Sequence, residues 1–395
     1  MRKALILIAA AAALFSCSTR KEPAMSERMV RSEMARCTDA SRLDFNEGKY
    51  KWNYTTGLEL KSFLDVYDTY GGEDIFNYVR AWYDTLVQTD GSIRTYSVDK
   101  YSTDHICPGV SLFYLYDKTG DEKFRMAMDT LKKQIDGQPR TEAGAFWHKK
   151  AYPHQVWLDG VYMSCPFYAT YASRYLEGEE QAAAYAEIVN EFKAAAEHTY
   201  DPATGLYRHA WDESRSMFWC DPATGQSAHC WGRALGWYCM ALVDVLEILP
   251  KDVEGREDLE ALLQTICREL PEWADHDSGV WYQVLDQPGR EGNYLEATCS
   301  AMFSYAWLKG IRLGALDASE LGYAKELYAN VTRQFISEDE DGLLDLNACC
   351  AVAGLGGKTM RKGDYAYYLS EPVRSNDAKG VGPFIWASLE MERLK

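Results

Sequence analysis

A short glycine turn recurs between the helix-like stretches of this chain, and it limits the folds that the chain can adopt. Each turn has an acidic or small residue before the glycine and apolar or aromatic residues after it. Successive turns lie 53, 61, 74 and 63 residues apart, with their glycines at Gly91, Gly144, Gly205, Gly279 and Gly342. A spacing of about sixty residues suits one helical hairpin plus a long loop, so a repeat architecture is expected.

Helix patterns dominate the sequence, whereas strand patterns are scarce. Apolar residues recur at steps of three and four, which is typical of amphipathic helices. Twelve stretches show this pattern: 24–42, 54–70, 74–88, 108–117, 121–136, 158–177, 181–199, 231–249, 257–274, 295–313, 319–336 and 380–393.

These stretches make six hairpins if the first helix pairs with the last. An open stack of hairpins needs polar helices at its ends, whereas a closed ring needs none. The last stretch is strongly apolar around Phe384, Ile385 and Trp386, which favours closure. We therefore predict an all-α fold, an (α/α)6 toroid in one domain, although helix periodicity alone also allows an open superhelix. In such a ring the long loops meet at one mouth, where a functional cleft is expected.

The first residues are typical of an export signal. A basic start precedes an unbroken run of twelve apolar residues from Ala4 to Phe15, too few to span a bilayer. The run ends at Ser16-Cys17, as in a bacterial lipobox. We predict a signal peptide over 1–16, a tether over 17–25 after a lipidated Cys17, and the (α/α)6 domain over 26–395. This describes an exported lipoprotein anchored on the periplasmic side; the alternative is an ordinary signal peptide with an incidental cysteine.

The composition narrows the range of ligands. The 59 acidic residues outnumber the 42 Lys and Arg, so the net charge is −17, which argues against binding to nucleic acid. The chain has 12 Trp and 27 Tyr but only 13 Phe, so most aromatic rings carry a polar group. Such rings suit a wet concave surface, although many of them simply bridge core and solvent. No obligate protein partner is evident.

No cofactor motif is complete. Gly356-Gly357-Lys358-Thr359 ends like a phosphate-binding loop, but Val352 stands where that loop needs its first glycine. The acidic turn at 339–342 resembles part of a calcium-binding loop, but Ser337 and Ala348 stand at two positions where such a loop needs oxygen ligands of the carboxylate type. The seven His residues are scattered, so we predict neither a cofactor nor a metal. The ten cysteines after Cys17 form no spaced pairs, and we expect mostly free, buried thiols.

Two carboxylates stand at predicted helix entries. Asp159 lies between Trp157 and Tyr162 at the start of an apolar helix. A poorly hydrated aromatic wall disfavours the charged form of a carboxyl group, which suits a general acid. An N-cap is an equally good interpretation of Asp159. Asp104 is a second carboxylate at a loop-to-helix entry, with the same alternative.

Two further segments combine aromatic residues with a cation or an imidazole. His209 lies between aromatic residues in a loop, where it can donate or accept a proton, although a structural role is the simpler interpretation. Near Arg233, the residues Trp231, Ala234 or Leu235, and Trp237 or Tyr238 cannot all share one helix face, so some of them line the cavity. An arginine there would bind a carboxylate with two hydrogen bonds. The alternative is a packed Trp pair with Arg233 extending to the surface.

Taken together, these segments resemble the unsaturated glucuronyl and rhamnogalacturonyl hydrolases of glycoside hydrolase family 105, which is related to family 88. The resemblance covers about Trp52 to Gly382, nearly the whole chain. One departure is Ser164-Cys165 before Pro166, where Ala-Gly is usual, and it narrows the site slightly. The motifs that carry the resemblance are Trp52–Gly57, Asp104–Gly109, Trp157–Met163, Tyr207–Asp212, Trp231–Trp237 and Lys379–Phe384.

The resemblance implies an unusual reaction on fragments that polysaccharide lyases leave behind. These carry a C4=C5 unsaturated uronic acid at the non-reducing end. Asp159 would protonate C4 and then activate water, and Asp104 would hold water or hydroxyls and tune Asp159. The uronate would bind His148, His209 and Arg233, with a weaker role for Lys379. The sugar subsite would be shaped by Tyr54, Trp157, Trp231 and Trp237.

Unsaturated galacturonyl-rhamnose from pectin is the first choice of substrate, and unsaturated glucuronyl units from other acidic glycans are the second. Two other functions remain open. One is a sugar epimerase or isomerase on the same toroid, with His148 and His209 as paired acid and base. The other is a non-catalytic glycan-binding lipoprotein, which needs aromatic stacking alone.

Overall fold

A computed structural model of the chain describes residues 23–394. The predicted signal peptide, Cys17 and most of the predicted tether lie outside the described residues. The chain is mostly helical, and no helix among the described residues is long and apolar enough to span a bilayer. All ten cysteines from Cys37 to Cys350 are free, and eight of them are buried.

Each of the twelve stretches predicted from periodicity contains a long helix, and most helix ends lie within three residues of those expected. Two predicted ends were wrong: α1 ends at Arg36, not at residue 42, and α9 ends at Glu269, not at residue 274, because 3-10 turns follow in both places. The short helix α12 and the 3-10 turns were not predicted. The α-helices are α1 (Met25–Arg36), α2 (Tyr54–Tyr70), α3 (Glu73–Leu86), α4 (Val110–Thr119), α5 (Glu122–Gly137), α6 (Leu158–Tyr175), α7 (Gly178–Thr199), α8 (Gly232–Ile248), α9 (Arg256–Glu269), α10 (Ala297–Leu313), α11 (Leu321–Phe335), α12 (Tyr365–Ser370) and α13 (Ala378–Arg393). The 3-10 helices are η1 (Ala40–Phe45), η2 (Val98–Lys100), η3 (Thr103–His105), η4 (Cys107–Gly109), η5 (Leu270–Trp273) and η6 (Ala318–Glu320).

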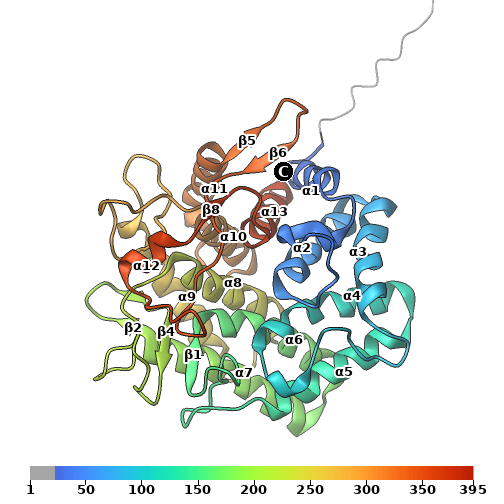
Figure 1. Cartoon of the computed structure of the whole chain (residues 1–395), viewed down its shortest axis with the longest axis horizontal. Coiled ribbons are helices and arrows are strands. Elements are labelled where there is room, and N and C mark those ends of the chain that lie inside the picture. Colours follow the sequence, from blue (N-terminus) through green and yellow to red (C-terminus); the bar gives the residue numbers. More distant parts are fainter. Residues whose placement is uncertain (1–22, 395) are drawn as a thin grey trace, which may run out of the picture.

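The long helices follow one another around the molecule in chain order (Figure 1). Helices α2, α4, α6, α8, α10 and α13 each pack against the next, and α13 packs against α2. Helices α3, α5, α7, α9 and α11 each pack against the helix that precedes them, and α1 packs against α13. The described part of the chain therefore has an inner and an outer layer of helices, and its first and last helices, α1 and α13, pack together.

The difference between the layers follows from the distribution of apolar residues. Every residue of α8 from Gly232 to Val243 is buried, as expected for a helix enclosed on all sides. In α3, by contrast, the buried positions include Ile75, Val79, Trp82 and Leu86, which form one stripe. The outer helices thus cover the inner ones with a single apolar face.

The repeated glycines have a common structural reason. All five adopt positive φ angles between 67° and 82°, which glycine tolerates far better than other residues. In each turn the glycine N–H donates to a carbonyl three or four residues earlier, as in Gly205 N to Asp201 O at 2.8 Å. Each turn follows an outer helix and opens the long loop that leads to the next inner helix.

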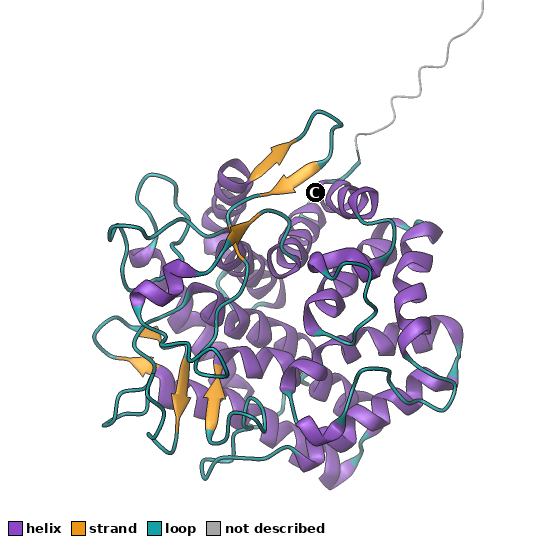
Figure 2. Cartoon of the chain, in the orientation of Figure 1, coloured by secondary structure: helices purple, strands orange, loops and turns teal. Residues whose placement is uncertain are grey.

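Within residues 23–394, strands occur only in these loops (Figure 2), as four two-stranded antiparallel ladders. The ladder most relevant to the site pairs β1 with β4, and it aligns Trp157 with Ala210. It also brings Leu158 N within 3.2 Å of His209 O. The ladders are β1 (Gln155–Trp157) with β4 (Ala210–Asp212), β2 (Tyr200–Asp201) with β3 (Leu206–Tyr207), β5 (Ile336–Glu338) with β6 (Leu344–Leu346), and β7 (Cys349–Cys350) with β8 (Val373–Arg374).

Candidate active site

The residues predicted to form the site come from one end of the inner layer. Asp104, His148, Trp157, His209 and Trp231 lie in the long loops that enter inner helices. The remaining predicted residues lie in the first two turns of inner helices: Tyr54, Asp159, Arg233, Trp237 and Lys379. Because all inner helices start at this mouth, the fold gathers distant sequence segments there.

Asp159 is the second residue of α6, and its surroundings are unlike those of an N-cap. No side-chain cap hydrogen bond forms at the start of this helix. The Oδ2 atom of Asp159 is buried without a hydrogen-bond partner and lies 3.5 Å from Nε2 of His209, which also lacks one. The side chain is 14% exposed. Asp159 therefore has an uncommitted carboxylate oxygen at the mouth of the inner layer.

Asp104 lies in η3 and is held by two neighbours from the next long loop. Its Oδ2 atom lies 2.5 Å from Nζ of Lys149, and its Oδ1 atom lies 3.6 Å from Nε2 of His148. Burial opposes the charged form of Asp104, but the Lys149 charge holds the pKa of this carboxyl below its usual value. The two carboxylates thus differ, because Asp104 has a cation in contact and Asp159 has only an imidazole.

His148 is a neutral imidazole at ordinary pH. Burial, together with the nearby Lys149 charge, lowers the pKa of His148 to about 4. Its Nδ1 atom lies 3.1 Å from Oγ1 of Thr103. The charges of both Asp104 and Asp159 act on this ring, so all three groups share one electrostatic environment.

Trp157 contacts both histidines. The His148 ring stacks on Trp157 with centroids 4.6 Å apart. The Tyr152 ring also stacks on Trp157, with centroids 5.3 Å apart. The His209 ring meets Trp157 edge-on at 5.1 Å. Trp157 is only 4% exposed, so it positions the imidazoles more than it presents a surface.

His209 is fully buried and is fixed from a distant part of the chain. Its Nδ1 atom lies 2.8 Å from the hydroxyl of Tyr368, and its ring packs against Trp231 at 4.7 Å. With Nδ1 engaged, Nε2 is the ring nitrogen that faces Asp159.

Arg233 is 1% exposed and lies beneath the site. One guanidinium nitrogen, NH2, donates to Cys350 O and to Oγ1 of Thr298, and it lies 3.5 Å from the carboxylate of Glu296. Its Nε atom is buried without a partner. Arg233 therefore brings a positive charge to the wall, and Nε is its uncommitted donor.

Tyr54 and Trp237 form the floor between these groups and the barrel interior. The Tyr54 ring meets Trp237 at 6.3 Å, and Trp237 packs on Tyr162 at 4.8 Å. Burial, followed by the charge of Asp104, raises the pKa of Tyr54 well above its usual value, so its hydroxyl stays protonated.

Lys379 pairs with two carboxylates other than Asp104 and Asp159. It is 3% exposed, and its Nζ atom lies 2.8 Å from Asp377 and 3.5 Å from Asp44. Its charge is therefore already neutralised at the start of α13.

Several residues of this arrangement were not predicted from the sequence, among them Lys149, Tyr152, Glu296 and Tyr368. Lys149 and Tyr152 lie between His148 and Trp157, so their proximity along the chain was an available signal. Glu296 and Tyr368 had no such signal, because the fold alone brings them to Arg233 and His209. Among residues 23–394, no cluster of three or more His, Cys, Asp or Glu side chains could hold a metal ion.

Comparison with known proteins defines the class. A family 105 glycoside hydrolase from C. acetobutylicum is 42% identical and superposes with a TM-score of 0.89, over 94% of this chain and all of the other. Protein Atu3128 of Agrobacterium fabrum is 44% identical over 213 residues, which cover 52% of this chain and 89% of the relative. The unsaturated rhamnogalacturonyl hydrolase YesR of Bacillus subtilis is 23% identical over 304 residues, or 74% of this chain and 78% of the relative.

These matches, together with a family model, identify the chain as a glycosidase. The model of glycosyl hydrolase family 88 matches residues 25–395. The chain belongs to this family, and it is related to family 105, as the resemblance of its motifs implied.

Proposed function

We propose that this glycosidase removes a 4,5-unsaturated uronic acid from the non-reducing end of oligosaccharides that lyases produce. The observation that carries the proposal is the uncommitted Oδ2 atom of Asp159, which faces His209 Nε2 at 3.5 Å without a cap hydrogen bond. An acid with no structural hydrogen bond is available for proton transfer. The activity after which YesR is named supports this substrate class.

The reaction is a hydration. Asp159 in its protonated form donates a proton to C4, which leaves an oxocarbenium-like centre at C5. The resulting carboxylate accepts a proton from water as the water oxygen bonds to C5. The hemiketal then opens between C5 and the ring oxygen, and C1 expels the rest of the sugar with its glycosidic oxygen. Carboxylate separation therefore does not decide retention or inversion in the usual way.

The residues around Asp159 would bind the water and the different parts of the substrate. Asp104, kept ionised beside Lys149, holds the water or substrate hydroxyls. His148, His209 and Arg233 provide the environment for the uronate carboxylate, and Lys379 remains a weaker candidate. The floor and walls of the sugar subsite are Tyr54, Trp157, Trp231 and Trp237.

The geometry favours hydrolysis over epimerisation. An epimerase with paired imidazoles needs both rings to face one carbon of the substrate. His148 and His209 are only 3% and 0% exposed, and each ring packs against Trp157, so neither presents an open face to a substrate carbon. A glycan-binding role without catalysis does not require the uncommitted carboxylate of Asp159.

We also propose that the helices form a closed (α/α)6 toroid of six hairpins. The packing of α13 on α2 and of α1 on α13 supports this arrangement. The domain boundaries at 1–16, 17–25 and 26–395 belong to the same proposal.

We propose further that lipid on Cys17 anchors the exported protein on the periplasmic side. A Cys17→Ser variant expressed in a bacterial host is expected to move from the membrane fraction to the soluble fraction. Unchanged membrane attachment would contradict lipidation at this residue.

The proposed activity is tested with purified enzyme and two unsaturated disaccharides, galacturonyl-rhamnose from lyase-treated pectin and a glucuronyl disaccharide. We expect the ultraviolet absorbance of the conjugated double bond to disappear, faster with the pectin fragment. The saturated galacturonyl-rhamnose is the matched control and should remain intact. Persistence of absorbance with both unsaturated substrates would overturn the proposal, whereas a faster reaction with the glucuronyl disaccharide would overturn only the pectic preference.

A further inference from the structure

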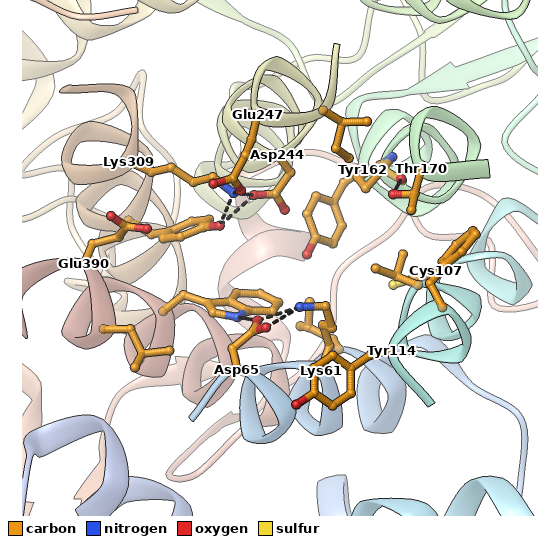
Figure 3. A pocket seen from close by; sticks show the side chains of 18 of the residues that line it. Lys61, Asp65, Cys107, Tyr114, Tyr162, Thr170, Asp244, Glu247, Lys309 and Glu390 are labelled. Atoms are coloured by element: carbon orange, nitrogen blue, oxygen red, sulfur yellow. Dashed lines mark hydrogen bonds and ion pairs between the residues drawn. The ribbon is translucent and has the colours of Figure 1, made fainter. Parts of the chain in front are cut away.

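A second cavity lies at the opposite end of the inner layer from the candidate active site. It has a volume of about 300 Å³, at the lower end of the range for small-molecule sites. Its walls come mainly from the C-terminal halves of inner helices, including Asp65 of α2, Thr170 of α6, Asp244 of α8 and Lys309 of α10. Figure 3 shows these side chains around the hollow.

The charges on the cavity wall are matched in pairs. Lys61 Nζ lies 2.6 Å from Asp65, and Lys309 Nζ lies 2.8 Å from Asp244 and 2.6 Å from Glu247. The arginines at the rim are also paired with carboxylates: Arg312 with Glu247 and Glu390, Arg393 with Glu390, and Arg174 with Asp117. A charged ligand would find no unpaired counter-charge here and would lose its own hydration.

Two polar atoms on the wall remain without partners in the described structure. The hydroxyl of Tyr162 makes no hydrogen bond to the protein, although the side chain is only 6% exposed, and it points into the cavity (Figure 3). Asp244 uses Oδ1 for the Tyr305 hydroxyl and for Lys309, while its Oδ2 atom has no hydrogen-bond donor. Both residues line the cavity, so these two atoms are open to it and free to hydrogen-bond to water or to a ligand there.

Aromatic rings supply the apolar part of the wall. Trp386 of α13 stacks on Tyr305 with centroids 5.6 Å apart and donates its indole N–H to Asp65 at 2.7 Å. Tyr114 and Tyr162 add further rings on other sides. Aromatic surface combined with neutralised hydrogen-bonding groups suits a molecule with apolar C–H faces and several hydroxyls.

We infer that this cavity binds a neutral polyhydroxylated molecule of monosaccharide size. The Tyr162 hydroxyl and the Asp244 Oδ2 atom would be its principal hydrogen-bond partners. The site is distinct from the catalytic one, because none of the predicted active-site residues lines this cavity. The two sites are neighbours where the Tyr162 ring packs on Trp237 at 4.8 Å.

The inference is tested by isothermal titration of the full chain with L-rhamnose, D-galactose and D-xylose, and with D-galacturonate and D-glucosamine as charged comparisons. At least one neutral sugar should bind saturably, with a Kd on the order of millimolar. Tyr162→Phe removes one hydroxyl and should weaken binding by about 3- to 10-fold. Asp244→Asn should also weaken it, and Lys309 keeps Glu247 as a partner in that variant.

Tyr168→Phe is the matched control, since Tyr168 lies on the same helix but bonds to Glu187 and does not line the cavity. It should bind the sugar as the wild type does. The inference would be overturned by the absence of saturable binding of every neutral sugar up to tens of millimolar. It would also be overturned if Tyr162→Phe and Asp244→Asn bound as tightly as Tyr168→Phe, or if the binding that Tyr162→Phe weakens were tighter for the charged sugars than for the neutral ones.

Discussion

Asp104 and Asp159 stand in different surroundings, and a single cation makes much of the difference. Lys149 contacts Asp104 at 2.5 Å and holds the pKa of that carboxyl below its usual value against the effect of burial. In a Lys149→Gln variant the pKa of Asp104 should rise, so Asp104 would protonate at a higher pH. The acid limb of the plot of kcat/KM against pH is therefore expected to move to higher pH.

The neighbouring Lys150 provides the control for this prediction. It lies over the Tyr101 ring at 5.5 Å and contacts no carboxylate among the described residues. Lys150→Gln should leave the acid limb in place. Equal shifts in the two variants would mean that general surface charge, not the Lys149 contact, governs Asp104.

The single-residue contacts of the site were only partly predictable. The residues predicted around the carboxylates lie in recognisable motifs, and His148, Trp157 and His209 do surround them. The contact between His209 and Tyr368 spans 159 residues and carries no local pattern, so only the fold reveals it. The burial of Arg233 against Glu296 was likewise invisible in the sequence, because charge pairing across helices has no fixed spacing.

At the scale of helices, close approach to neighbouring backbone depends on particular glycines. A Cβ atom at Gly57 of α2 would lie 2.6 Å from Cβ and 2.7 Å from Cα of Pro108. Gly57→Ala should therefore destabilise the fold by about 1–3 kcal/mol in urea unfolding. Gly322→Ala in α11 is the control, because a Cβ atom at this position would have no neighbouring atom within 4 Å. The higher helix propensity of alanine should stabilise this variant by up to about 1 kcal/mol. A Gly57→Ala protein as stable as Gly322→Ala would refute the close packing.

Helix α7 carries a buried acid that links stability to pH. Glu191 is 2% exposed and accepts the Phe146 N–H at 2.7 Å, and burial raises its pKa from 4.5 to about 8. The pKa of Glu191 is higher in the folded state than in the unfolded state. Its contribution to the free energy of unfolding is therefore fully present below pH 4.5 and is lost as the pH rises through about 8. Glu191→Gln keeps an acceptor for Phe146 and cannot ionise.

The Glu191→Gln variant should match the wild type near pH 5 and exceed its stability increasingly toward pH 8. The upper bound of the difference is about 5 kcal/mol, from about 1.4 kcal/mol for each pH unit. Urea unfolding of both proteins across this pH range measures the difference in their free energies of unfolding. The other titrating groups are the same in both proteins, so their contributions cancel in that difference. A difference that stays constant with pH would contradict a raised pKa for Glu191.

At the scale of the whole molecule, one hydrophobic cluster runs from Met29 in α1 to Leu389 in α13. Trp386 ties the ends together, since it bonds to Asp65 of α2 and stacks on Tyr305 of α10. Unfolding followed by tryptophan fluorescence and by far-ultraviolet circular dichroism should therefore give coincident transitions. Trp386→Ala should lower both midpoints together, at a cost of about 3–5 kcal/mol. Separate transitions in the wild type would indicate independent subdomains.

The helical architecture was more predictable than the site. Helix starts have local signals, such as the side chains of Asn53 and Asp121, which accept backbone N–H groups in the first turns of α2 and α5. The repeated glycines marked the turns because positive φ angles favour that residue. Short ladders such as β1 with β4 were missed, because two or three residues carry no detectable alternation.

The central claim is that Asp159 supplies the proton that starts hydration of the C4=C5 bond. The most direct test compares wild type and Asp159→Asn on unsaturated galacturonyl-rhamnose, following double-bond absorbance and released rhamnose together. In the wild type both should change in a one-to-one ratio. The Asp159→Asn protein should fold and bind the disaccharide, with kcat reduced by about 10²- to 10⁴-fold. Near wild-type turnover in this variant, or rhamnose release while the absorbance persists, would contradict the account.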